Sequence, residues 1–150
     1  MIRYEPYANS GMILILTERS DAHAELVRTA ITARGASVAV LETDRFANNT
    51  FCLEYGDETG CQLLESAGET IELGDVETVW CRRLRSPKLG TTGTHDPRED
   101  VVTSVCCLLM DRFWVNPYDN EMAARYKPYQ IEVASRVGFD ILPTLVTNNP

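Results

Sequence analysis

With 150 residues, 44% of them hydrophobic, the chain has the length of one domain, or of one domain and part of a second. A net charge of −8 argues against nucleic-acid binding, because a duplex binder needs a basic face that displaces counterions. The sequence has no cleavage signal and no apolar run near the roughly 18 residues of a spanning helix, which predicts a cytoplasmic protein without membrane binding. It has no C-x-x-C pair, which predicts neither a metal site nor a disulfide.

The N-terminal third predicts one βαβ unit. Met12–Thr17, MILILT, is a continuous apolar run that is typical of a central parallel strand buried on both faces. Ser20 or Asp21 can cap the following helix, whose apolar residues recur at helical spacing until Gly35 closes it in the C′ position. Residues 36–41, ASVAVL, predict a second buried strand, reached through a right-handed crossover.

The middle of the chain changes character. Residues 50–55, 61–64 and 70–73 are short, alternating segments separated by turn-prone residues, which predicts a small antiparallel hairpin set. Val76–Cys81, VETVWC, returns to the composition of a buried strand and predicts a third strand of the core. A surface loop is expected at residues 85–95.

A second long helix is predicted after this loop. Asp96 suits the N-cap, Pro97 the first helical position and Glu99 the capping box. We expect one apolar stripe to pack on the sheet, formed by Val101, Val102, Val105, Leu108, Leu109 and Phe113. Residues 114–117, WVNP, predict a short final strand.

The last 35 residues predict another helix, from Pro128 to Gly138, and then a strand-like TLVT at residues 144–147 that we expect to be unpaired. Lys127 precedes the proline, so its ammonium is expected near a helix N-terminus, where free amides attract anions. Lys127 is therefore a candidate phosphate ligand, with a solvated surface lysine as the alternative.

Arg82 and Arg83 directly follow an apolar strand. A guanidinium at the carboxyl end of a strand suits a carboxylate or phosphate, which makes both residues candidates for binding a substrate or an anion. Since alternate residues of a strand point to opposite faces, only one is expected to face a given crevice. The alternative is an ion pair with an acid on the same rim, for which Asp44 is the first candidate ahead of Glu42 and Asp75.

Several other chemistries lack their motifs. The turn after the first strand, Thr17–Asp21, contains no glycine, so neither G-x-G-x-x-G nor a P-loop is present. No G-x-S-x-G elbow is present either. His23 and His95 are expected to be solvated or locally hydrogen-bonded.

Three parts of the chain together resemble a known family. They are ILILTERSDAHAELVRTAITARGASVAVLETDRF at residues 13–46, VWCRR at 79–83, and NP with AARYKPYQIEVASRVGFDILPTLVTNNP at the end. Their order and spacing resemble the N-terminal part of the microviridin-type graspetide synthetases, which are ATP-grasp ligases that mature ribosomal peptides. The resemblance implies an α/β, three-layer, Rossmann-like pre-ATP-grasp domain with a mainly parallel sheet over residues 1–117. Residues 118–150 then hold a linker helix and the beginning of the ATP-grasp lid domain.

The resemblance also implies an activity. In this family MgATP phosphorylates an Asp or Glu side chain of a precursor peptide, and a hydroxyl or amine of that peptide attacks the acyl phosphate. A macrolactone or macrolactam results. A leader segment docks the peptide, and the enzymes form homodimers.

For the residues of this chain, the resemblance implies ATP and Mg²⁺ as cofactors of the intact enzyme and Lys127 as a ligand of the ATP phosphates. Arg82 and Arg83 match the tryptophan-containing strand-end motif. Pro128 departs from the family pattern. The catalytic and Mg²⁺-holding residues are expected beyond residue 150, so residues 1–150 alone are expected to be inactive.

Two other functions fit the same residues. Asn116-Pro117, Lys127 and Leu142-Pro143-Thr144 are widespread among ATP-grasp enzymes, so a ligase that joins an amine to a small carboxylic acid is one alternative. The other is a binding or dimerisation module without catalysis, because a fold does not fix a function.

Overall fold

The computed structural model describes residues 11–45, 62–64, 70–84 and 97–148. The chain forms two compact units, Met1–Val115 and Asn116–Pro150, which are described separately. The division falls close to the boundary predicted after residue 117.

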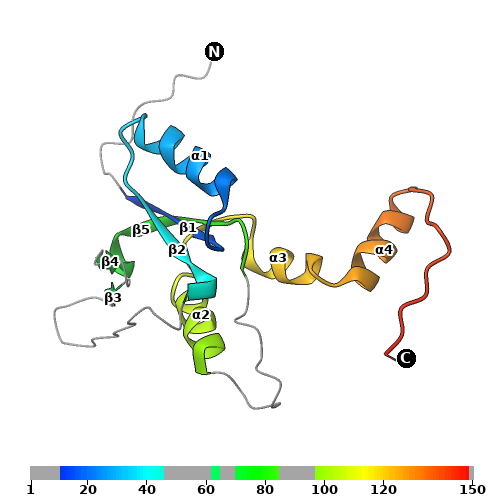
Figure 1. Cartoon of the computed structure of the whole chain (residues 1–150). Coiled ribbons are helices and arrows are strands. Elements are labelled where there is room, and N and C mark those ends of the chain that lie inside the picture. Colours follow the sequence, from blue (N-terminus) through cyan, green and yellow to red (C-terminus); the bar gives the residue numbers. More distant parts are fainter. Residues whose placement is uncertain (1–10, 46–61, 65–69, 85–96, 149–150) are drawn as a thin grey trace. The chain divides into compact units, whose positions relative to one another are not determined.

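The core of the first unit is a four-stranded, fully parallel sheet in the order β2-β1-β5-β6. Its strands are β1 (Met12–Thr17), β2 (Val38–Glu42), β5 (Val76–Cys81) and β6 (Phe113–Val115). The predicted central position of β1 is confirmed, since it pairs on both sides and Leu14 and Ile15 are fully buried. Helices α1 and α2 lie on opposite faces of the sheet, which gives the predicted three layers (Figure 1).

Helix α1 (Ala22–Thr32) begins and ends at predicted signals. Its N-cap is Asp21, whose carboxylate accepts the backbone N–H groups that follow, whereas Ser20 lies in the turn before it with a φ of 61°. At the other end Gly35 adopts a φ of 80°, and the N–H of Ala36 reaches back to the carbonyl of Ile31.

Helix α2 (Pro97–Leu108) starts at the predicted proline, and its capping residue Asp96 lies outside the described residues. The buried positions at this helix and directly after it are Val102, Val105, Cys106 and Leu109. The predicted stripe is wrong at Leu108 and Phe113, which are 38% and 69% exposed. The helix stops at Leu108, so helical spacing no longer applies to Phe113, which belongs to β6.

Strand β6 instead follows the alternation of a sheet. Its middle residue, Trp114, is buried, and the indole N–H donates to the carbonyl of Leu109 at 2.7 Å.

The predicted hairpin is confirmed in part: β3 (Gln62–Leu64) pairs antiparallel with β4 (Thr70–Glu72). Two short 3-10 turns follow β2 and β4, at Thr43–Arg45 and Leu73–Asp75. The predicted strand at 50–55 and the predicted loop at 85–95 lie outside the described residues.

The second unit contains α3 (Tyr118–Ala124) and α4 (Lys127–Arg136). Helix α4 begins one residue before the predicted Pro128, because any residue of the first turn tolerates the missing N–H of proline.

The end of α4 is as predicted. Gly138 has a φ of 88°, its N–H donates to Ser135, and the N–H of Phe139 donates to Ala134. Residues 144–147 are exposed and form no strand. A strand without a neighbour is unstable because its backbone N–H and C=O groups have no partners. In the described part of the chain no helix combines the length and apolarity needed to cross a membrane.

Candidate functional site

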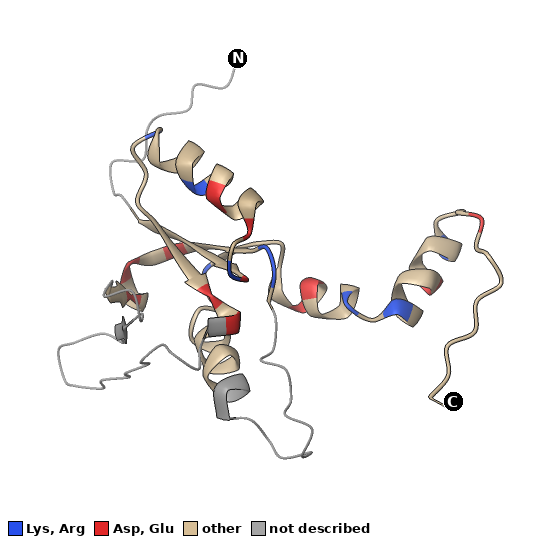
Figure 2. Ribbon diagram, in the orientation of Figure 1, with Lys and Arg blue, Asp and Glu red and all other residues tan. Residues whose placement is uncertain are grey.

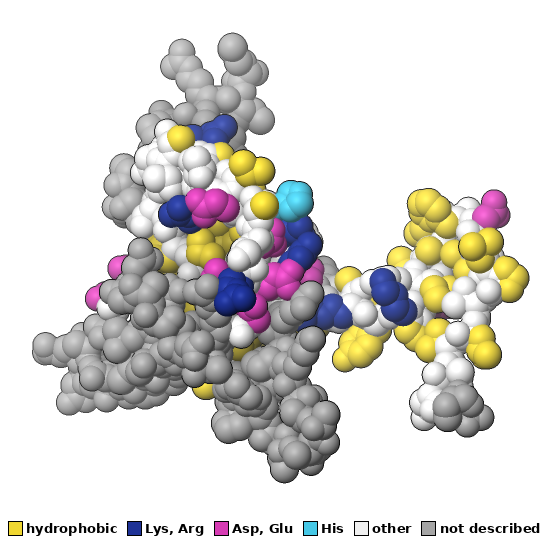
Figure 3. Space-filling view, viewed as in Figure 1, with side chains coloured by type: hydrophobic (Ala, Val, Ile, Leu, Met, Phe, Trp, Pro, Cys, Tyr) yellow, Lys and Arg dark blue, Asp and Glu magenta, His cyan; other side chains and the backbone are white. Residues whose placement is uncertain are grey.

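The carboxyl edge of the sheet gathers charged residues where the strand order reverses. The chain passes from β1 through α1 to β2 on one side of β1, whereas β5 lies on its other side. In open parallel sheets, ligands bind outside the carboxyl ends of the strands at such a switch point. Figure 2 marks acidic and basic residues on the ribbon around this edge of the first unit, and Figure 3 shows charged side chains of both signs gathered there.

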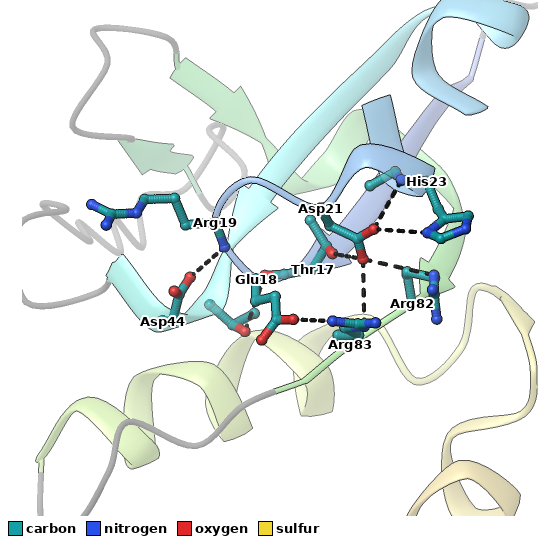
Figure 4. Close-up of polar contacts among 10 residues, drawn as sticks. Thr17, Glu18, Arg19, Asp21, His23, Asp44, Arg82 and Arg83 are labelled. Atoms are coloured by element: carbon teal, nitrogen blue, oxygen red, sulfur yellow. Dashed lines mark hydrogen bonds and ion pairs between the residues drawn. The ribbon is translucent and has the colours of Figure 1, made fainter. Parts of the chain in front are cut away.

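The two arginines after β5 reach the same carboxylate. The backbone N–H groups of Arg82 and Arg83 both donate to the carbonyl of Leu16, at 2.9 and 3.2 Å. Their Nε atoms lie 3.7 and 3.6 Å from Oδ2 of Asp21 (Figure 4). Both guanidinium groups therefore approach one carboxylate, whereas the prediction from strand alternation, that only one of them faces a given crevice, stays a prediction. Strand alternation ends at Cys81, and the bend beyond it brings both side chains together.

Asp21 lies at the centre of this cluster, with a side chain that is only 2% exposed. Its carboxylate accepts the hydroxyl of Thr17 at 3.0 Å and the backbone N–H groups of His23 and Ala24 at 3.0 and 3.4 Å. Burial alone would raise the pKa of Asp21, but these hydrogen bonds and the charge of Arg82 outweigh it and lower the pKa. Asp21 is therefore ionised at neutral pH.

Arg83 is held by two acids. Besides Asp21, its Nη1 bonds to the carboxylate of Glu18 in the turn after β1. The hydrogen bond and charge of Glu18, with a smaller contribution from Asp21, raise the pKa of the Arg83 guanidinium. These contacts join the turn after β1 to the end of β5.

Asp44 has a different partner from the predicted one. Its carboxylate accepts the backbone N–H of Arg19 at 2.8 Å, which fixes the turn after β1. The prediction that Asp44 pairs with Arg82 or Arg83 is wrong for a topological reason. Asp44 follows β2, and β1 separates β2 from β5.

A pocket of about 240 Å³ opens beside this turn, between α1 and β2. Four acids line it, namely Glu18, Asp21, Glu25 and Glu42, together with Val40 and several small residues. The described residues that line it therefore favour a cationic or neutral ligand over an anion. Across the described ranges, no group of three His, Cys, Asp or Glu residues could hold a metal ion.

Lys127 lies in the second unit, as the first residue of α4, which confirms the predicted helix terminus. The N-cap residue, Tyr126, makes no side-chain capping bond. The ammonium of Lys127 donates to the side-chain oxygen of Gln130 at 3.0 Å, and the side chain is exposed.

Sequence reasoning identified the arginines but treated Asp21 only as a possible helix cap, and it assigned no role to Thr17 or Glu18. The order of the strands was the signal that could have identified Asp21, Thr17 and Glu18 as neighbours of the arginines. If β1 is central, the turn after it must lie beside the end of β5.

The fold and this edge define an α/β domain of the pre-ATP-grasp type. Residues 12–122 match the family described as the MvdD pre-ATP grasp domain. Macrocyclase MdnB from Microcystis aeruginosa MRC is 30% identical, with a TM-score of 0.72 over 93% of this chain and 48% of MdnB. Macrocyclase MdnC from the same organism, in a structure bound with precursor peptide MdnA, is 29% identical, with a TM-score of 0.69 over 92% of this chain and 47% of MdnC.

A third structure shares the fold at lower identity. The ATP-grasp ligase PsnB, complexed with a phosphomimetic variant of a minimal precursor, Mg and ADP, is 19% identical, with a TM-score of 0.60 over 91% of this chain and 48% of PsnB. No curated protein matches the chain significantly.

The chain therefore belongs to the MvdD pre-ATP-grasp family, and the predicted resemblance to microviridin-type maturases is confirmed. The predicted α/β fold with a parallel sheet is confirmed as well. The chain spans about half the length of the solved structures that it matches.

Proposed function

We propose that this chain is the N-terminal part of an ATP-dependent ligase that matures a ribosomal precursor peptide. The ligase activates Asp or Glu side chains of the peptide as acyl phosphates and closes macrocyclic ester or amide links. The observation that carries this proposal is the family match over residues 12–122, extended by the similarity to two macrocyclases over more than nine-tenths of the chain.

The switch-point edge supports the proposal. Arg82 and Arg83 present guanidinium groups at the edge where parallel sheets bind ligands, and the proposed substrate is rich in carboxylates. The structure of MdnC with a precursor peptide supports a precursor peptide as the partner of this protein, and a leader segment on that peptide is part of the proposal.

ATP and Mg²⁺ are the proposed cofactors, supported by the PsnB complex with Mg and ADP. Lys127, at the N-terminus of α4, is the proposed contact of this chain with the ATP phosphates. The chain covers about half of the solved relatives. We place the metal-binding and catalytic residues in the part of the ligase that corresponds to their other half, so residues 1–150 alone are expected to be inactive.

Two further properties belong to the proposal. The ligase is a homodimer, as the family resemblance implies, and it works in the cytoplasm. Among the described residues Cys81, Cys106 and Cys107 form no disulfide, which is compatible with a reducing compartment.

The test is a reaction of the ligase that carries these residues with MgATP and peptides encoded by neighbouring short reading frames rich in Thr, Ser, Asp and Glu. Mass spectrometry is expected to show the loss of one water per ring, only when ATP is present. Arg82→Ala is expected to reduce ring formation far more than the equally charge-changing control Arg136→Gln, which alters an exposed pair on α4. Ligation of free amino acids or small amines, without ring formation, would favour the other ATP-grasp class.

The expectation for residues 1–150 alone has its own test. A thermal-shift titration with MgATP in the millimolar range is expected to give little change in the melting temperature. A saturable shift would show that these residues bind the nucleotide by themselves.

A further inference from the structure

The two arginines of the switch-point edge have different surroundings. Arg83 bonds to Glu18 through Nη1, and its Nε faces Asp21. The shortest contact of Arg82 with Asp21 is from Nε, at 3.7 Å, which is longer than a hydrogen bond. Its side chain is 29% exposed, and its two terminal nitrogens form no hydrogen bond with an acceptor of the described residues. The bidentate edge of Arg82 is therefore open.

His23 lies next to the other oxygen of the Asp21 carboxylate. Its Nδ1 lies 3.7 Å from Oδ1 of Asp21, and its side chain is 73% exposed. The close-up shows the side chains of His23 and Arg82 extending on the same side of Asp21 (Figure 4). In the space-filling view the imidazole lies against basic side chains at the surface (Figure 3). Two donors thus border one open face above a buried carboxylate.

Three backbone donors near this face are already used. The N–H groups of His23 and Ala24, in the first turn of α1, donate to Asp21, and the N–H of Arg19 donates to Asp44. A phosphate at a helix N-terminus relies on such amides. A carboxylate needs only the two parallel N–H groups of one guanidinium, so the open donors suit a carboxylate better than a phosphate.

We infer that Arg82 and His23 form a binding site for a carboxylate side chain of an acidic peptide, and that Arg83 is a positioning residue. Arg83 acts through Glu18 and Asp21, which hold the turn after β1 against the end of β5. The identity of the peptide rests on the proposed function, whereas the carboxylate chemistry rests on the geometry of the site.

The experiment is an NMR titration of the isotope-labelled 150-residue chain with a synthetic peptide rich in Asp and Glu. The same sequence with Asn and Gln, glutarate and inorganic phosphate are titrated in parallel. We expect the acidic peptide and glutarate to shift the side-chain resonances of Arg82 and His23. The amide peptide is expected to cause no shift, and phosphate to bind more weakly than glutarate.

The variants separate binding from positioning. Arg82→Gln is expected to weaken peptide binding about tenfold or more, whereas Arg136→Gln, which changes the net charge equally, leaves it unchanged. Arg83→Gln is expected to lower the melting temperature more than Arg82→Gln and to weaken binding less. His23→Ala, which removes the second donor of the site, is expected to weaken the binding of the acidic peptide.

Three results overturn the inference. The first is an affinity of Arg82→Gln for the acidic peptide within about twofold of that of the unmodified chain, since losing a charged hydrogen bond has a far larger effect. The others are equal binding of the amide peptide and tighter binding of phosphate than of glutarate. If circular dichroism shows Arg82→Gln to be unfolded, Arg82→Lys decides, because it keeps the charge without the fork. Unchanged binding by Arg82→Lys contradicts the site, and weaker binding supports it. Glutarate binding at Arg82 in a ligase that closes no rings would refute the proposed function and leave the site standing.

Discussion

The carboxylate of Asp21 is predicted to hold the turn after β1, and two substitutions separate its roles. Asp21→Ala removes the helix cap and the charge together. Asp21→Asn removes the charge and keeps one oxygen that can cap α1, while its amide N–H, in place of the other carboxylate oxygen, can donate to the hydroxyl oxygen of Thr17. The difference between the two variants therefore measures the hydrogen bonds.

The magnitudes follow from burial. Losing the cap costs about 1 kcal/mol, and leaving the buried hydroxyl of Thr17 without an acceptor costs about 1 kcal/mol more. Asp21→Ala is thus expected to lower the free energy of unfolding by about 2 kcal/mol. Arg82 and Arg83 are partly exposed and lie beyond hydrogen-bond distance of Asp21, so Asp21→Asn is expected to cost less than about 1 kcal/mol.

Urea unfolding followed by tryptophan fluorescence measures these values. Trp80 and Trp114 are the two tryptophans of the chain, and both lie in the first unit, which contains Asp21. The charge of Asp21 also gives a pH dependence. Because its pKa is lowered by folding, its contribution is complete above the unfolded value, about 3.9, and is lost as the pH falls through the folded value. The unmodified chain is expected to lose more stability below about pH 4 than Asp21→Asn.

Two results refute this reasoning. A cost for Asp21→Ala below about 0.5 kcal/mol, the size of an ordinary surface substitution, would show that Asp21 does not hold the turn. Equal costs for Asp21→Ala and Asp21→Asn would assign the stabilisation to charge alone.

Three further predictions use the same unfolding assay. Leu14→Ala, at a fully buried position of β1, is expected to lower the free energy of unfolding by about 3 kcal/mol. Leu26→Ala, at a 69% exposed position, is expected to lower it by less than about 0.5 kcal/mol. Similar losses for the two variants would contradict the assigned core. Gly35→Ala is expected to cost about 1 kcal/mol because of its φ of 80°, while Gly74→Ala, with open space and no positive φ, is expected to be nearly neutral. Ser20→Gly is expected to raise stability by about 0.5 kcal/mol by relieving its φ of 61°, and a loss would show that the serine side chain stabilises the turn.

The strands of the core were predictable because their signal is local. The apolar runs Met12–Thr17 and Val76–Cys81 coincide with β1 and β5 residue for residue. The glycines that end α1 and α4, Gly35 and Gly138, adopt the positive φ that their place after a helix requires. The predicted stripe of α2 failed at Phe113, because the period changes from helix to strand within a few residues.

The sequence by itself determined the α/β class, the central strand and the presence of two arginines at a strand end, because these depend on composition and period along the chain. Only the tertiary structure decided which acid the arginines face. Asp44 and Asp21 both follow parallel strands at the same edge, but Asp21 follows the strand beside β5 and Asp44 lies one strand further away. Strand order depends on long-range pairing between strands. It brings the end of β5 beside the turn after β1, where Arg83 pairs with Glu18 and Asp21, and within the described residues the terminal nitrogens of Arg82 remain available to a ligand.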